Sequence, residues 1–595
     1  MEDLENAIAY HREALTLRPL GHPDRSMSLN NLAIAVHSRY EKSSMVEDLE
    51  ESFLLSEQAV NDLAASSKYR LTAAIQWAQR AQHHHHNSVI RAYSMSLHLL
   101  NRCLIFYPDV DSQQKFLATV RIPRTLASDA ASAAIDAEDL ETAVELLEQG
   151  RAILWSKMKG YRYPLDPLRE ANRQLADALE KTSLQLEQLA LSLESQLMDH
   201  NKPNLEVQMQ RNRILLEEWE KIIQQIREID GFHNFLQAVP FPTLQTAAAE
   251  GPVILINISN YRSDAIIIHN NKPLTLVTLP NVQPKHLTHL GQQLALARLF
   301  KTPQRLTLIL AILHDLWNDI VSPVCNSLSQ LGVPQESHIW WCPTSKLCAL
   351  PLHAAGLYEP RKQNFNLPDI YISFYTPTLS ALISARSNLN TVIGQSIVPK
   401  LLVIGQPDTE SLSNVQDEID GIQQFGDFVD VMVGADASCE AVLHGLQEHS
   451  WAHFACHGSL GHQGDDYQPF RASFKLHDEN LTLLDLIQAR LPNAKFAFLA
   501  SCHSAAGDPN TPDETIHLAA ALQFCGFQSV VGTLWELADK AGPIVSKAFY
   551  NYMFCNAGNK ADIRDSAKAL SVAVRELRKQ GAPLDCWIVL VHIGV

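Results

Sequence analysis

The sequence predicts an all-helical N-terminal region followed by an α/β domain built on a mostly parallel β-sheet. Two observations lead to this fold class. The first part of the chain repeats an amphipathic helical pattern, whereas from Pro252 onward short apolar runs alternate with segments of helix length. Parallel strands are covered by helices on both faces, so they read as continuous apolar runs. We expect three parts, at residues 1–160, 161–245 and 246–595, with the core of the last at 330–595.

The composition is that of a globular protein and limits the partners. Hydrophobic residues make up 46% and charged residues 19% of the chain, and the net charge is −17. Phosphate backbones repel a negative protein, so nucleic acids and anionic membranes are poor candidates for the main partner. No uninterrupted apolar run reaches the roughly 18 residues of a membrane-spanning helix, so we expect no membrane insertion. The ten cysteines follow no spacing pattern, which favours reduced thiols and a cytoplasmic location.

The first region contains an internal repeat. The motif Glu2-Asp-Leu-Glu recurs as Glu47-Asp-Leu-Glu after 45 residues, and the segment Leu29-Asn-Asn-Leu-Ala lies between the two copies. A fixed period with two helices per unit predicts a helical solenoid. The residues around Arg18-Pro resemble tetratricopeptide repeats of the fungal type, and only the first period is clear. Two unrelated pairs of amphipathic helices remain the alternative.

A run of four histidines, from His83 to His86, looks like an affinity tag but lies inside the chain. Successive residues of a helix point in different directions, so four consecutive side chains cannot all face one metal ion. We therefore expect a solvated helix face or a loop at this position, and no metal site.

Two helical segments are expected between the repeats and the α/β domain. Residues 139–155 continue the repeat-like pattern. We expect them to form either a structural linker or a helix that transmits the conformational state of the repeats to the α/β domain. Residues 165–237 carry leucines at seven- and four-residue spacings, which indicates a helical hairpin or coiled coil whose stripe serves packing. The segment Asn201-Lys-Pro203 interrupts this pattern and marks the turn.

Strand-like runs begin after Pro252, at the point where the period of the hydrophobic pattern changes. The clearest runs are Val253–Asn257, Asp264–Ile268, Leu274–Thr278, Leu401–Gly405 and Ser529–Thr533. The first three are separated by turn residues and predict a hairpin. The later runs are separated by segments of helix length, which is the signature of βαβ units and therefore of a parallel sheet.

Two apolar runs of this domain end on reactive side chains. The run that starts at Trp451 ends on His457, with Gly458 directly after it, and the run that starts at Phe496 ends on Cys502. Sheets of this type place ligand chemistry at the carboxyl ends of their strands. If the two runs are neighbours, His457 and Cys502 lie side by side, where an imidazole lowers the pKa of the thiol and activates it as a nucleophile.

Each of these residues also has a simpler interpretation. Most cysteines are inert core residues. Cys456 should point away from His457, because adjacent residues of a strand face opposite sides of the sheet. A metal site formed by His457, Cys502 and His503 lacks the ligand spacing that would support it. We expect neither a metal nor an organic cofactor.

The pattern His-Phe-Ala-Cys-His-Gly, followed by Leu-Ala-Ser-Cys and then by Ala-Gly-Asp, resembles the CHAT peptidases, a family of caspase-like and separase-like domains. Further matching segments occur within residues 250–595. They are Ile339–Thr344, Leu350–Gly356, Tyr375–Leu379, Asp513-Glu514, His517–Ala520, Gly526, Val530–Trp535, Trp587 and Ile593-Gly594. The resemblance implies a caspase-like three-layer α/β sandwich and a cysteine peptidase.

The resemblance also implies a role for each residue of the site. Cys502 would attack the scissile carbonyl, and His457 would protonate the leaving amine, as a Cys–His dyad. The backbone N–H groups of Gly458 and Cys502 would form the oxyanion hole. Asp513 and Glu514 could receive a basic substrate side chain, or they could cap the next helix.

Two positions depart from the family pattern, because Ser501 and His503 stand where Ala and Gln are more usual. Neither change removes a catalytic group, and His503 could tune the nucleophile or contact the substrate.

Two functions remain open at this point. The first is a regulated cysteine endopeptidase that cuts a protein substrate, held inactive by the repeats until an activating protein or ligand binds them. The second is an interaction scaffold whose peptidase-like domain is idle. Relatives with this architecture act in programmed cell death, which is an analogy of architecture alone.

Overall fold

The computed structural model describes most of the chain, and its described residues separate into two compact units, Met1–Val239 and Pro240–Val595. Each unit buries its own set of apolar side chains. The residues outside the described ones are 1, 20–24, 63–64, 66, 106–121, 124, 152–165, 197–204, 231, 233–234, 236–238, 301–302, 359–364, 391–398, 408–413, 460–461, 464–465, 468–471, 490, 492, 501–518, 520–521, 524, 536, 539 and 556–560.

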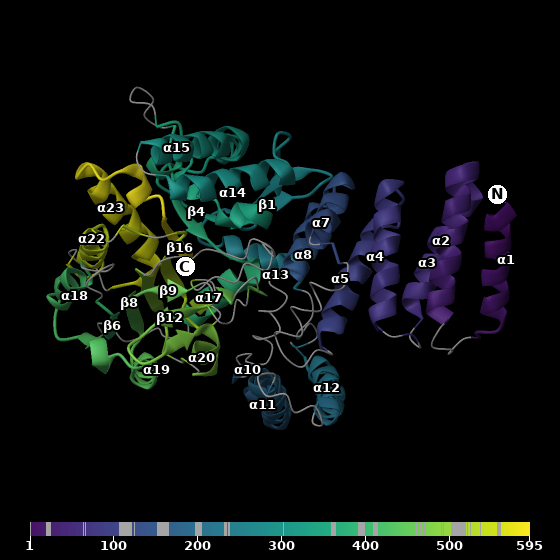
Figure 1. Ribbon diagram of the computed structural model, residues 1–595, viewed down its shortest axis with the longest axis horizontal. Helices are drawn as coiled ribbons and strands as arrows, with labels where there is room; N and C mark the ends of the chain where they lie inside the picture. The colour runs from purple at the N-terminus through teal and green to yellow at the C-terminus, as the bar shows by residue number, and fades with distance from the viewer. Residues whose placement is uncertain are drawn as a thin grey trace. The chain divides into compact units, whose positions relative to one another are not determined.

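The first unit begins with helices that pack against one another in chain order (Figure 1). They are α1(Glu2–Thr16), α2(Arg25–Ser43), α3(Val46–Asn61), α4(Ser67–His83), α5(Val89–Ile105), α7(Leu126–Asp136) and α8(Leu140–Gly150). Small residues such as Ala33, Ala59 and Ala78 are fully buried between them, which lets the helices approach closely. The paired helices are therefore present as expected, and their identity as tetratricopeptide repeats stays a prediction.

A helical hairpin follows in the same unit. It is formed by α10(Asp166–Ala171), α11(Arg173–Gln196) and α12(Leu205–Arg227). The leucine stripe supplies its core, in which Leu168 and Leu179 pack with Ile222 and Ile226. The predicted turn at residues 201–203 lies outside the described residues.

The second unit is organised around a sheet with the strand order β3-β2-β1-β4-β5-β16-β15-β14-β8-β6-β7. Its strands are β1(Val253–Ile258), β2(Ser263–Ile268), β3(Thr275–Thr278), β4(His338–Pro343), β5(Ile372–Tyr375), β6(Leu401–Gly405), β7(Val429–Val433), β8(Trp451–Ala455), β14(Phe496–Leu499), β15(Ser529–Thr533) and β16(Leu590–Gly594). Pairs β1/β4, β4/β5, β6/β7, β6/β8, β8/β14 and β14/β15 are parallel, and β1/β2, β2/β3 and β15/β16 are antiparallel. The predicted fold class, a helical region followed by a mostly parallel sheet, is confirmed.

Helices cover both faces of this sheet. They are α14(Pro284–Leu299), α15(Gln304–Leu316), α16(Ser322–Gln330), α17(Leu379–Asn390), α18(Val415–Gln423), α19(Cys439–Glu448), α22(Gly542–Cys555) and α23(Ser566–Lys579). The chain moves from β6 outward to β7 and then back past β6 to β8. Because parallel crossovers are right-handed, that reversal places α18 and α19 on opposite faces. The result is three layers, with α18 packed beside α22.

One helical stretch, Gln304–Gln330, is long and apolar enough by composition to cross a membrane. It comprises α15, a π-helical turn at Trp317–Val321 and α16. Half of its most apolar window is buried inside the protein. A core helix has the same length and composition, so this stretch is weak evidence for a membrane span.

Candidate active site

The two runs that end on His457 and Cys502 are neighbours in the sheet, as predicted. Strand β8 pairs in parallel with β14, and Leu499 stands opposite Phe454 at the carboxyl end. The pairing continues one residue further, because the backbone N–H of Ala500 donates to the Phe454 carbonyl at 3.0 Å. The chain therefore leaves both strands at the same edge of the sheet.

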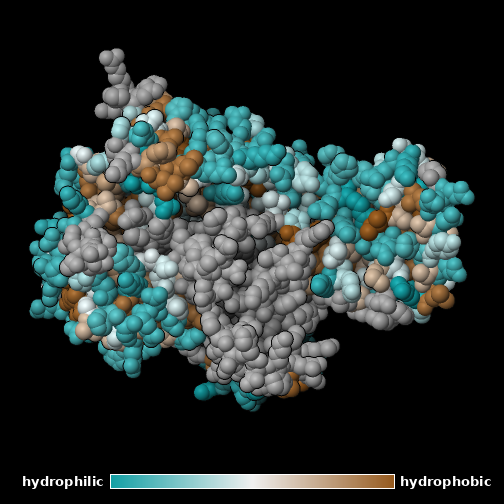
Figure 2. Space-filling model, viewed as in Figure 1, coloured by the Kyte–Doolittle hydropathy of each residue, from teal (hydrophilic) through white to brown (hydrophobic). Residues whose placement is uncertain are grey.

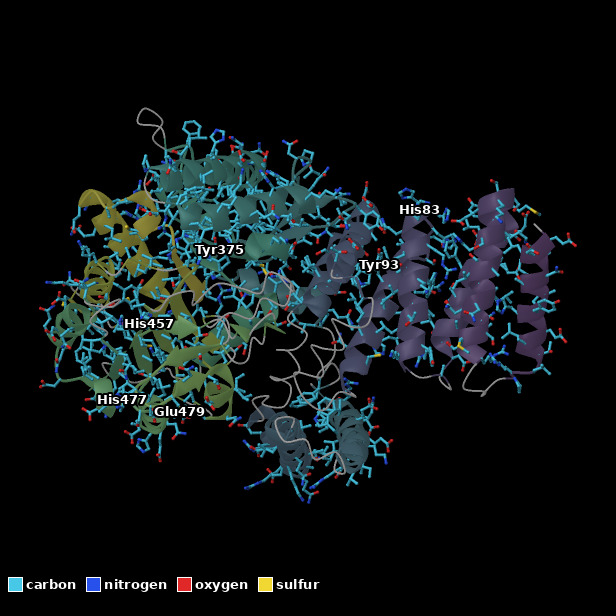
Figure 3. The ribbon with its side chains drawn as sticks, viewed as in Figure 1. His83, Tyr93, Tyr375, His457, His477 and Glu479 are labelled. Atoms are coloured by element: carbon cyan, nitrogen blue, oxygen red, sulfur yellow. The ribbon has the colours of Figure 1, made fainter. Side chains whose placement is uncertain are left out.

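The backbone at His457 is held by a second, small sheet. The His457 carbonyl accepts a hydrogen bond of 2.8 Å from the backbone N–H of Lys475. Gly458 begins β9(Gly458–Ser459), which pairs with Phe474 of β12(Ser473–Lys475). His457, which is labelled in Figure 3, is half-buried at this edge of the sheet, whereas Cys456 is buried.

The remaining predicted site residues fall in one segment, 501–518, which lies outside the described residues. They are Cys502, His503, Asp513 and Glu514. The structure thus brings together the strand that carries His457 and the strand that leads to Cys502. The contact between the two side chains, and the proposed oxyanion hole, stay predictions.

A hydrogen-bonded network under β8 was missed by the sequence analysis. His453 is completely buried, and its Nε2 lies 3.1 Å from Oε1 of Glu418 on α18. Its Nδ1 lies 3.0 Å from the hydroxyl of Tyr550 on α22. Because an ionised carboxylate only accepts, the Nε2 hydrogen points to Glu418 and the Tyr550 hydroxyl faces Nδ1. Every polar atom of this imidazole is therefore satisfied inside the core.

This network also contacts the strand that leads to Cys502. The His453 ring stacks on Phe498 of β14, with ring centres 4.9 Å apart. His453 and Phe498 each stand four residues before a predicted catalytic residue, His457 and Cys502. The network consequently ties both strands to α18 and α22 and fixes their register close to the predicted dyad.

A close approach at the start of α22 completes the arrangement. A Cβ added to Gly542 would lie 2.9 Å from Oε2 of Glu418, so a larger residue would press against the carboxylate. The carboxylate therefore lies near the N-terminal end of a helix, where the helix dipole favours negative charge. His453 was visible in the sequence as a lone polar residue in an apolar strand, but nothing local identified Glu418 as its partner.

A second network joins two of the segments that carry the family resemblance, and it also reaches the residue after Trp587. The Nδ1 of His353 lies 3.0 Å from the Tyr375 hydroxyl, and its Nε2 lies 3.0 Å from the Ile588 carbonyl. Since a carbonyl only accepts, Nε2 carries the hydrogen and Tyr375 donates to Nδ1. Desolvation lowers the pKa of His353 to about 4 and raises the pKa of Tyr375 above its ordinary value. The neutral ring holds these segments together.

A pocket of about 690 Å³ lies beyond the carboxyl end of β15, with Leu296 and Leu299 of α14 in its walls. Trp535, two residues after β15, also lines it, is 2% exposed, and has an indole N–H without a partner. Figure 2 shows hydrophobic surface near α15 in this unit. The volume suits a small ligand or a side chain. Since β8, β14 and β15 run parallel, this pocket and His457 occupy the same edge of the sheet.

No group of three or more His, Cys, Asp or Glu side chains in the described part of the chain is arranged to hold a metal ion. The geometry of the described residues thus offers strand pairing, a half-buried imidazole and a pocket at one sheet edge.

Comparison with known proteins finds a match to a family model within the second unit. Residues 310–594 match the CHAT domain. No curated protein matches the sequence. The matched range includes the His457 strand and the Cys502 segment, as well as both hydrogen-bonded networks.

Among solved structures, the chain is similar to the Saccharomyces cerevisiae separase–securin complex, at 12% identity and a TM-score of 0.40, over 97% of this chain and 54% of that chain. It therefore spans about half the length of that chain. It is also similar to the pro- and mature domains of Porphyromonas gingivalis RgpB, at 11% identity and a TM-score of 0.30, over 46% and 69% of the two chains. The Arg-specific cysteine proteinase gingipain R matches at 12% identity and a TM-score of 0.33, over 46% and 67%. Similarities at this level carry no conclusion about activity.

Proposed function

We propose that the second unit is a cysteine endopeptidase, in which Cys502 is the nucleophile and His457 is the acid and base. The observation that carries this proposal is the pairing of β8 with β14 up to Ala500 and Phe454. The chain continues from these two residues to Cys502 and His457 within three residues on each strand. The match of residues 310–594 to the CHAT domain supports the same assignment.

The chemistry needs two transfers at this edge of the sheet. The Cys502 thiolate attacks the scissile carbonyl to form a thioester, and His457 gives a proton to the departing amine. Water then attacks the thioester and releases the acid with the help of the same imidazole. The N–H groups of Gly458 and Cys502 are the proposed donors to the oxyanion, and no metal takes part.

Peptide cleavage with matched variants tests this proposal. Wild type, Cys502→Ala and His457→Ala are incubated with a diverse peptide library, and cleavage sites are read by mass spectrometry. We expect the cuts to fall by at least roughly 10³-fold in both variants, because catalytic residues that act as a unit fail together. Cys456→Ala is the matched control, since this thiol is buried beside His457 and should be dispensable.

Two outcomes would count against the assignment. Cuts that persist in Cys502→Ala, or that vanish equally in Cys456→Ala, would place the nucleophile elsewhere. Absence of cuts in wild type, together with failure of an electrophilic thiol probe to label Cys502, would favour the idle interaction scaffold. Selective labelling of Cys502 without cleavage would indicate a primed enzyme that awaits its activator.

The same library reports the specificity. Asp513 and Glu514 are proposed to receive a Lys or Arg side chain at the cleaved bond, because paired carboxylates attract a cation. The substitutions Asp513→Asn and Glu514→Gln should then weaken the preference for basic residues. Unchanged preference would leave these two residues as helix caps.

Regulation by the helical unit is part of the proposal. An intracellular peptidase needs restraint, so the repeats would hold the site inactive until a protein or ligand binds them. Removal of residues 1–160 should then raise the cleavage rate. Unchanged or abolished cleavage in that shortened chain would oppose autoinhibition.

A further inference from the structure

Two histidines from different helices meet in the first unit. His37 belongs to α2, and His84 directly follows α4; their Nε2 atoms lie 3.0 Å apart. The two rings are inclined to each other with centres separated by 5.1 Å. His37 is 8% exposed, so its ring lies almost entirely inside the unit. The contact joins one residue of the histidine run to a residue 47 positions away.

The end of α4 determines which histidines of the run reach this contact. The backbone N–H of His86 donates to the Ala81 carbonyl at 2.9 Å, and His85 has a φ of 49°. A residue in the left-handed conformation just past a helix, with this bond, forms a Schellman-type cap. The chain therefore reverses at His85, which is exposed, while His84 stays beside α2.

His86 is occupied elsewhere. Its Nδ1 lies 2.7 Å from the Ser88 hydroxyl, and its ring stacks on Phe53 at 4.2 Å between centres. Only His83 and His84 of the run therefore line the pocket that contains His37. The sequence-based expectation concerned only the four consecutive histidines. It did not reveal that His37 on α2 lies beside one of them.

The pocket has the chemistry of a cation site with soft nitrogen ligands. Its volume is about 410 Å³, and it is lined by three imidazoles together with Glu41 and Arg80. An imidazole binds a metal ion through a ring nitrogen that carries no hydrogen.

Two opposite charges, Glu41 and Arg80, lie beside the pair. Oε1 of Glu41 lies 3.9 Å from Nδ1 of His37, on the far side of the ring from His84. A carboxylate at that place orients a ligating imidazole and raises its basicity. The Arg80 guanidinium opposes a cation, but it donates to the Gln76 carbonyl and to the Ser56 hydroxyl, and is held by these bonds.

The separation of the two nitrogens fits a shared ion. Two nitrogens bound to one tetrahedral Zn²⁺ at 2.0–2.1 Å lie about 3.3 Å apart. The observed 3.0 Å between the Nε2 atoms of His37 and His84 differs by only about 0.3 Å. A change of tautomer that moves the hydrogens to Nδ1 leaves a lone pair on each Nε2 atom, and a rotation of the rings then brings both lone pairs to one ion.

We propose that His37 and His84 form a binding site for a divalent first-row transition-metal ion such as Zn²⁺, Ni²⁺ or Cu²⁺, with His83 and water as the further ligands. In the described residues no three such side chains are already grouped for a metal. Two ligands are thus in place, and His83, whose ring centre lies 4.8 Å from that of His84, has to turn to become the third. The ordinary interpretation of the pair is a single N–H···N hydrogen bond.

A metal titration of the full chain, carrying no added histidine tag, separates these interpretations. Binding of Zn²⁺ and Ni²⁺ is measured by isothermal titration calorimetry in wild type, His37→Gln, His84→Gln and His85→Asn. His85→Asn is the matched control, because it shortens the histidine run while Asn tolerates the left-handed conformation. We expect one site whose affinity falls at least tenfold in His37→Gln and in His84→Gln, and stays within about twofold in His85→Asn.

Each alternative result overturns the proposal. Equal losses in His37→Gln and His85→Asn, or a loss in His85→Asn alone, would mean that the run binds metal as an adventitious tag. Absence of micromolar binding in wild type would leave the pair as a hydrogen bond. Circular dichroism of each variant shows that it is folded. Should His37→Gln unfold, His84→Gln decides, because His84 is only half-buried.

Discussion

Two histidine clusters, one in each unit, differ in what their rings contact. In the helical unit, His37 meets His84 at the wall of a pocket, nitrogen to nitrogen. In the sheet unit, His453 is fully buried and lies between the Glu418 carboxylate and the Tyr550 hydroxyl. A histidine side chain therefore contacts another imidazole in the helical unit, whereas in the sheet unit it contacts a carboxylate and a hydroxyl.

The difference shows how the partners of an imidazole decide its role. The fully buried His453 ring uses both nitrogens on the Glu418 carboxylate and the Tyr550 hydroxyl, so neither nitrogen is left for a ligand from solvent. Two rings that face each other share one hydrogen, and a change of tautomer exposes two lone pairs. The cluster around His453 is thus expected to govern stability. The His37 pair is expected to contribute little to stability until an ion binds.

The largest effect is expected for Glu418→Ala. Loss of the carboxylate leaves the His453 N–H buried without an acceptor, which costs about 1–3 kcal/mol of unfolding free energy, and it also removes the packing of a buried side chain. Urea unfolding measures the loss, and hydrogen-exchange mass spectrometry assigns it to β8 and α22. The exposed neighbour Asp417→Ala should stay within about 0.5 kcal/mol. If Asp417→Ala destabilised the protein as much as Glu418→Ala, the hydrogen bond from His453 to Glu418 would not be the source of the loss.

Acid should destabilise the sheet unit through histidines that are held neutral. Burial lowers the pKa of His592 to about 3, and desolvation lowers that of His353 to about 4, from an ordinary value of 6.5. A depressed folded-state pKa gives stability that is complete above 6.5 and is lost as pH falls toward the folded value.

Each of these histidines should therefore remove on the order of 1.4 kcal/mol per pH unit below 6.5. Denaturant midpoints of wild type and His592→Gln, compared between pH 7 and pH 5, test this slope. A variant with the same slope as wild type would show that His592 does not titrate in this range.

A smaller loss is expected for Tyr550→Phe. The ring of Tyr550 stays buried, and only the hydroxyl that faces His453 Nδ1 is removed. An unsatisfied buried acceptor costs about 1–3 kcal/mol, less than the loss of the carboxylate. The same urea measurement applies. A loss as large as that of Glu418→Ala would make the hydroxyl, and not the carboxylate, the main partner of His453.

The smallest effect is expected for His37→Gln in the absence of metal, below about 1 kcal/mol, because a neutral hydrogen bond is lost. Saturating Zn²⁺ should raise the melting temperature of wild type and leave the variant unchanged, since a ligand stabilises only the state that binds it. Differential scanning calorimetry with and without Zn²⁺ measures both quantities. A strongly destabilised metal-free variant would make His37 a structural residue like His453.

Much of the fold could be read from the chain because it is encoded locally. The apolar runs around Leu401, Trp451, Phe496 and Ser529 all became neighbouring strands of the sheet. A parallel strand buried on both faces needs a continuous apolar run, and that requirement is visible without any partner. The position of His457 at the end of such a run followed from the same rule.

The sequence by itself thus determined the helical region, the mostly parallel sheet, and the strand ends that carry the predicted dyad. Only the tertiary structure decided that Glu418 and Tyr550 enclose His453, and that His37 meets one member of the histidine run. The physical reason is the range of the interactions. Periodicity, turns and caps act over a few residues, whereas side chains 35 to 97 positions apart meet only after helices have packed against strands and against each other.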